Sequence, residues 1–146
     1  MMRYLLSLIF CFIGVICGIF IVGDSISFHL NIYSFIVIGL FPIIFTGILF
    51  GFKEIFLAFS VPFKKELENK KLLQALHFLK IYNKTIWIVG IIAVIIVIVA
   101  MLRTLADKSG WGPILSFAFN SILYCGIINM IIIIPFSILI KRQIKW

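Results

Sequence analysis

Four polar side chains interrupt an otherwise apolar run near the C-terminus, namely Ser116, Asn120, Ser121 and Tyr124. At about 100° of helical rotation per residue, they fall within an arc of about 140°. Hydroxyl and amide groups on one helix face can bind a neighbouring helix or line a path for water and ions. Pro135 lies on the same side, and its ring frees a backbone carbonyl because proline has no N–H to donate. The pattern therefore fits two interpretations, interhelical packing or a wall that faces a partner helix and an ion path.

The other reactive residues form no recognisable enzyme or metal site. The sequence has no nucleophile–base pair, no carboxylate pair and no phosphate-binding loop, and its two histidines stand far apart. The three cysteines, Cys11, Cys17 and Cys125, include no C-x-x-C pair. Cys11 and Cys17 would point about 240° apart on a helix. The sequence thus predicts neither an enzyme nor a metal or cofactor site.

Composition places the chain in a membrane. Of its 146 residues, 64% are hydrophobic and 12% are charged, with a mean hydropathy of +1.26. A soluble domain of this length leaves roughly a third of its unfolded surface exposed, which is too much for so apolar a chain. Lipid removes that conflict but cannot satisfy backbone hydrogen bonds, so the spanning elements must be helices. We therefore predict one all-α membrane domain over residues 1–146.

Four apolar stretches are long enough to cross the bilayer. They are residues 4–22, 32–52, 85–102 and 113–140. Crossing a hydrocarbon core of about 30 Å takes about 20 helical residues. The fourth stretch is longer, so it must tilt or project beyond the membrane. The first is too long for a signal peptide and no cleavage site follows it, so we expect a retained helix. The prediction is a protein with four transmembrane helices.

The positive charge indicates how these helices are oriented. The net charge is +8, and seven of the 13 lysines and arginines lie in the connection 53–84. Four more flank the chain ends: Arg3, Lys141, Arg142 and Lys145. The other two connections hold only Arg103 and Lys108. Because positive loops stay in the cytoplasm, both termini and the connection 53–84 are predicted to be cytoplasmic, and no nucleic-acid partner is needed to explain the charge.

The cytoplasmic connection is predicted to contain an amphipathic helix over residues 64–84. Pro62 marks the break before this helix. Apolar residues recur at helical spacing, and lysines and glutamates fill the opposite face. These apolar residues are Leu72, Leu73, Leu76, Leu79 and Tyr82. The charged face is either solvated or in contact with a partner or with anionic headgroups.

The order of several motifs resembles the MotA/TolQ/ExbB family, which includes the flagellar stator subunit MotA. In the C-terminal third, Gly112-Pro113, Leu123-Tyr124 and Pro135 follow one another as they do in that family. Tyr124 lies 12 residues after Gly112 and 11 residues before Pro135, which agrees with the family spacing. Near the N-terminus, the turn Gly23-Asp24 is similar to the family's glycine-rich turn, and the segment Ser34–Gly39 that follows is similar to its second helix.

The resemblance implies an inner-membrane protein of a bacterial cell. Such subunits form a homo-oligomeric, pentameric ring around the single helices of a MotB/ExbD/TolR-like partner, whose aspartate binds the driven ion. The residues that would face the partner or the ion path are Ser116, Asn120, Ser121, Tyr124 and Pro135. Two third-helix positions depart from the family, since Trp87 replaces a proline and Val94 replaces a threonine. The cytoplasmic connection is also much shorter than the family's cytoplasmic domain.

Two alternative functions remain open at the level of sequence. One is a non-conducting membrane assembly or scaffold subunit that keeps the fold without the ion path. The other is a small pore-forming or transport protein. No acidic or basic residue lies in the middle of an apolar stretch. Since ion carriers usually place an ionisable group there, the chain is not expected to conduct ions without a partner.

Overall fold

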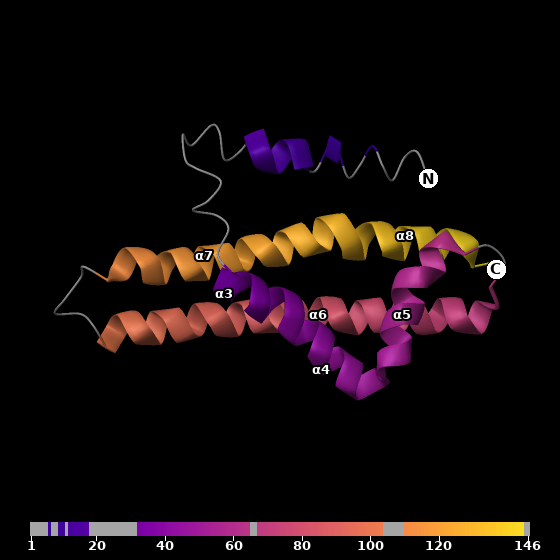
Figure 1. The fold of residues 1–146 in the computed structure, drawn as a ribbon, viewed down its shortest axis with the longest axis horizontal. Helices are drawn as coiled ribbons and strands as arrows, with labels where there is room; N and C mark the ends of the chain where they lie inside the picture. Colours follow the sequence, from indigo (N-terminus) through magenta and orange to yellow (C-terminus); the bar gives the residue numbers. More distant parts are fainter. Residues whose placement is uncertain are drawn as a thin grey trace.

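The protein is built from long helices that lie side by side (Figure 1). A computed structural model describes residues 6, 9–10, 12–17, 32–64, 67–103 and 110–144, and none of these lies in a β-strand. Three helices are long and apolar enough to cross a membrane: Ile32–Phe50, Asn69–Arg103 and Trp111–Gln143. These features are those of an all-helical, multi-pass membrane protein. The predicted first span, 4–22, falls mostly outside the described residues, although residues 12–17 are helical.

The helix Ile32–Phe50 contains a π-helical turn. It comprises α3 (Ile32–Phe35), the π-helix η1 (Ile36–Leu40) and α4 (Phe41–Phe50). The π turn precedes Pro42, and the Phe41 N–H donates to the Ile36 carbonyl five residues back. Proline cannot donate to the preceding turn and its ring crowds the carbonyl there, so a widened turn accommodates it. The buried Thr46 hydroxyl then donates to the Pro42 carbonyl at 2.7 Å.

The chain reverses direction at Gly51. This residue has φ +92°, a conformation that favours glycine because a Cβ atom would be strained there. After it come α5 (Phe52–Ser60) and the 3-10 helix η2 (Val61–Phe63). Figure 1 shows α5 turning back from the end of α4 and crossing α6 toward α8. The helix of the predicted span 32–52 thus ends at Phe50, and α5 begins at Phe52, one residue before the connection predicted for 53–84.

The helix α6 (Asn69–Arg103) is continuous over 35 residues, about 52 Å at 1.5 Å per residue. The sequence predicted two elements here, a cytoplasmic helix over 64–84 and a span over 85–102. Among the described residues, no helix ends at residue 84, because α6 runs without a break from the predicted cytoplasmic helix into the predicted span. Neither proline nor glycine interrupts it there, and the Thr85 hydroxyl donates to the Ile81 carbonyl at 3.0 Å. The buried residues Tyr82 and Ile86 continue one stripe across the junction.

The last helix packs antiparallel to α6. It consists of α7 (Trp111–Ile128), the π-helix η3 (Asn129–Ile133) and α8 (Ile134–Gln143), close to the predicted span 113–140. The π turn again precedes a proline, Pro135, and the Ile134 N–H donates to the Asn129 carbonyl. The α6–α7 contact is close at Gly90, where an added Cβ would lie 2.6 Å from the Cys125 sulfur. The Cys125 thiol donates to the Ile86 carbonyl at 3.5 Å.

Aromatic rings join α5, η2, α6 and α8 in the half of the molecule where α6 begins. Phe59 meets Tyr82 and Phe136 edge-on, at centroid distances of 6.5 and 5.8 Å. Phe63 meets Phe136 edge-on at 5.6 Å. The Gln143 amide donates to the Pro62 carbonyl at 3.4 Å, which ties the end of α8 to η2. These rings pack on the hydrophobic core, which extends along α6 and α7 to Ile86 and Cys125.

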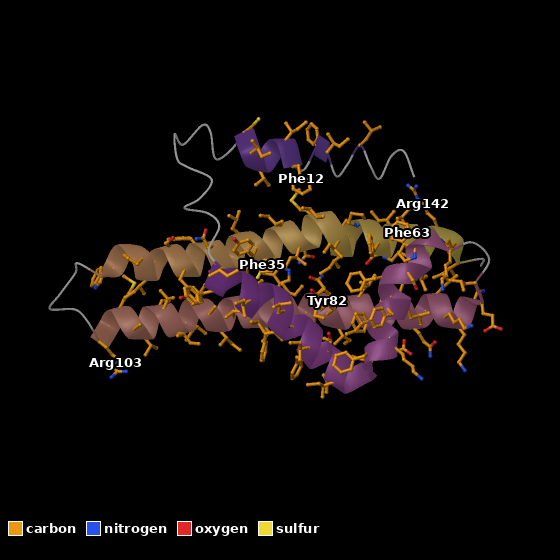
Figure 2. The ribbon with its side chains drawn as sticks, viewed as in Figure 1. Phe12, Phe35, Phe63, Tyr82, Arg103 and Arg142 are labelled. Atoms are coloured by element: carbon orange, nitrogen blue, oxygen red, sulfur yellow. The ribbon has the colours of Figure 1, made fainter. Side chains whose placement is uncertain are left out.

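Basic residues stand at both ends of the long helices, and Lys80 and Lys84 lie further along α6. In Figure 2, Arg103 at the end of α6 and Arg142 at the end of α8 lie at opposite ends of the molecule. The exposed Lys70 and Lys71 stand in the first turn of α6, at the same end as Arg142. The fold thus places the basic segments before and after the last two spans together.

Candidate functional site

The polar residues of α7 divide between the surface and the interior of the bundle. Ser116 is exposed, whereas Asn120, one turn further on, is only 5% exposed. The Asn120 amide donates to the Ser116 hydroxyl oxygen at 3.3 Å. These residues are four apart and therefore stack on one helix face. The pair presents a hydroxyl at the surface of an otherwise apolar helix, held by a buried amide.

Ser121 belongs to the contact between α7 and α3. Its side chain is fully buried, and its hydroxyl donates to the Phe117 carbonyl at 2.8 Å. The buried Ser34 hydroxyl of α3 donates to the same carbonyl at 3.4 Å. One backbone oxygen therefore accepts two side-chain hydrogen bonds from two helices. Ser121 therefore packs inside the subunit and is not exposed at its surface.

Tyr124 and Pro135 occupy half-buried positions. The Tyr124 ring meets Phe35, the last residue of α3, edge-on, with centroids 6.2 Å apart. Figure 2 shows Phe35 beside α7. Pro135 is the second residue of α8, directly after the π turn. Because the π turn reorganises the hydrogen bonds around this proline, carbonyl groups near it can be freed from the helical ladder.

The two positions at which the sequence departs from the MotA/TolQ/ExbB pattern, Trp87 and Val94, lie on α6. Trp87 is 42% exposed, and Val94, seven residues later, is half-buried. Gly90, between them, is the residue packed against Cys125. The valine side chain has no hydroxyl group to offer at this position. Trp87 instead adds a large exposed ring just after Lys84, as is common at a membrane–water boundary.

Three buried polar residues of the described spans were missing from the sequence-based site, namely Ser34, Thr46 and Asn129. Asn129 is 8% exposed and donates from its amide to the Cys125 carbonyl at 3.3 Å. Ser34 is fully buried against α7. Each is a polar side chain inside an apolar run, and this exception to the apolar pattern could have identified it from the sequence. Asn129 also opens the π turn that leads to Pro135.

The apolar segments of the three described spans contain only neutral side chains. Segments 32–50, 85–102 and 111–140 contain no Asp, Glu, His, Lys or Arg. No group of metal-binding side chains occurs among the residues that the structure describes. Hydroxyl, amide and carbonyl groups can complete the coordination of an ion or bind a helix, but a compensating charge for an ion must come from elsewhere.

Comparison with known proteins adds no relative. No protein-family model matches the chain, and no curated protein matches it significantly.

Proposed function

We propose that the chain is a MotA/ExbB/TolQ-like subunit of an ion-driven stator complex in a bacterial inner membrane. In this proposal, several copies form a ring around the single transmembrane helix of a MotB/ExbD-like partner. The partner carries the carboxylate that binds the ion, and the ring turns as ions pass. Both termini and the basic segments around α5 and the start of α6 face the cytoplasm.

The observation that carries this proposal is the Ser116–Asn120 pair. An exposed hydroxyl supported by a buried amide is costly on a helix that faces only lipid, so it favours contact with protein or water. The proline-linked π turn on the same helix supports the proposal, because π turns are frequent at functional sites. The absence of charge in the described spans explains why a partner must supply the carboxylate.

A scaffold subunit without ion conduction is the second candidate. It is favoured by the hydrogen bonds of Ser121 and Ser34, which use the polar side chains for packing within one subunit. Val94 also favours it, since a valine cannot replace the hydroxyl of a threonine near an ion path. In this role the chain keeps the helices and assembles with partners, but nothing passes between them.

Ion flux in proteoliposomes tests the proposal. We expect the purified chain alone to pass neither protons nor sodium faster than empty liposomes. Co-reconstitution with a single-span protein that carries a membrane aspartate and is encoded beside this chain should produce flux. Changing that aspartate to asparagine should abolish the flux. Robust flux from the chain alone would favour a pore-forming protein, and no flux with the partner would favour the scaffold.

A further inference from the structure

A hollow of about 420 Å³ opens where the C-terminal end of α4 meets α5 and α6. Its volume lies within the usual range for small-ligand sites. Three separate elements line it, and the Gly51 reversal brings them together. The lining residues are Phe50, Glu54, Lys70, Leu73, Gln74, His77 and Phe78.

The hollow has an aromatic floor and a polar rim. Phe50 meets Phe78 and His77 edge-on, at centroid distances of 6.0 and 5.8 Å. Phe78 is almost fully buried, whereas His77 is exposed. Gln74 and Lys70 are also exposed on this face of α6, and they lie one and two turns before His77, respectively. The site can therefore hold an apolar group below and polar groups at its edge.

The rim carries charges of both signs on different elements. Glu54, in the first turn of α5, contributes a carboxylate, and Lys70, in the first turn of α6, contributes an ammonium group. A ligand with a single charge would attract one of these side chains and repel the other. The complementary ligand is a zwitterion, with an anionic group toward Lys70 and a cationic group toward Glu54.

The surroundings place this hollow at the depth of lipid headgroups. Lys80 and Lys84 lie between it and the uncharged part of α6, so the hydrocarbon region begins beyond them. On α5, Phe52 and Phe56 remain 57% and 76% exposed. A short helix that crosses the long helices and exposes large aromatic rings beside charged residues is typical of the membrane interface.

We propose that this hollow binds the headgroup of an ethanolamine phospholipid from the adjacent leaflet. The phosphate lies toward Lys70 and Gln74, and the primary ammonium group donates hydrogen bonds to the Glu54 carboxylate. The acyl chains extend from the hollow into the lipid that surrounds the spans. A choline headgroup has no N–H to donate, and a glycerol headgroup leaves Glu54 without a cation. The site therefore selects ethanolamine.

Native mass spectrometry of the purified, delipidated protein tests this selection. The protein is mixed with equal amounts of palmitoyl-oleoyl phosphatidylethanolamine, phosphatidylcholine and phosphatidylglycerol, and the lipid adducts are compared. We expect the ethanolamine lipid to be enriched over both others. Glu54→Gln and Lys70→Gln should each reduce the enrichment about threefold, as expected for partly exposed charge pairs.

Glu68→Gln and Lys71→Gln are matched controls, since both residues are exposed, neighbour the site and do not line it. They should leave the enrichment unchanged, and thermal unfolding should show that all four variants remain folded. Equal retention of the three lipids would overturn the proposal. A preference for phosphatidylglycerol that persists in Glu54→Gln, or equal effects of site and control variants, would overturn it as well.

Discussion

At the scale of single residues, the polar side chains of α7 have two different roles. Ser121 is used in packing against α3, and the Ser116–Asn120 pair reaches the surface. The sequence predicted that these residues share one side of a helix, but it could not divide them. That division depends on where α3 crosses α7, and a contact between distant segments leaves no periodic pattern in either one.

Single replacements of the two buried asparagines by leucine test which of them supports oligomer association and which serves only packing within the subunit. Asn120 supports the exposed Ser116, so Asn120→Leu should weaken oligomer association by about 1 kcal/mol, the usual worth of an interhelical hydrogen bond in membranes. Asn129→Leu is the matched control, because the Asn129 amide donates to a backbone carbonyl, that of Cys125, whereas the Asn120 amide donates to an exposed side chain. It should leave association unchanged. Sedimentation in detergent measures both, and equal association of Asn120→Leu and wild type would show that Asn120 serves packing alone.

The contact between Gly90 and Cys125 predicts a steric effect that a second substitution relieves. In Gly90→Ala the new methyl group would collide with the Cys125 sulfur, so the protein should lose about 2 kcal/mol of stability. Cys125→Ala in the same chain removes the sulfur and should restore most of the loss. Gly126→Ala is the control, since no atom lies within 4 Å of its added Cβ. Thermal unfolding in detergent reports all three, and a neutral Gly90→Ala would refute the close approach of α6 and α7.

At the scale of elements, hydropathy predicted the apolar parts of the helices but not where all of them begin and end. The spans 32–52 and 113–140 agree with Ile32–Phe50 and Trp111–Gln143 within a few residues. The sequence assigned residues 64–84 and 85–102 to two elements because the polarity changes between them, whereas the structure has one helix, Asn69–Arg103, across that point. The reversal into α5 was missed, although Gly51 after an apolar run is a common helix end.

Hydrogen exchange tests the continuity of α6. The amides of residues 82–86 should be as protected as those on either side, because each belongs to the same helical ladder. The first amides of α5 provide an internal control, since N–H groups in the first turn of a helix lack helical partners. They should exchange faster. Rapid exchange at residues 82–86 would instead indicate a flexible junction between two separate helices.

At the scale of the whole molecule, the fold brings basic segments that are far apart in the sequence to the same end of the bundle. The basic turns at the start of α6 and the end of α8 lie together, and Arg103 lies at the opposite end (Figure 2). Hydropathy and the positive-inside rule predicted this arrangement, because antiparallel helices must return their ends to the same side. The sequence could not place α5, whose crossing of α6 depends on the conformation of one glycine.

Accessibility of single cysteines tests the orientation of the bundle. In a background with the native cysteines replaced, Lys70→Cys should react with a membrane-impermeant maleimide only after the cytoplasmic side is opened. Gly110→Cys, at the other end of the hairpin, should react in intact cells. The physical reason is the retention of positively charged segments in the cytoplasm. The reverse pattern of labelling would mean that the bundle is inverted.

The mass of the assembly, extracted from membranes and measured by native mass spectrometry, tests the proposed function most directly. A stator-like subunit needs a ring of copies to surround its partner, and the ring should contain five by resemblance to the MotA/TolQ/ExbB family. We predict one dominant species of five copies of this chain, with additional mass where the single-span partner is retained. A species of one copy at every protein concentration, in mild detergent and in nanodiscs alike, would contradict the proposal.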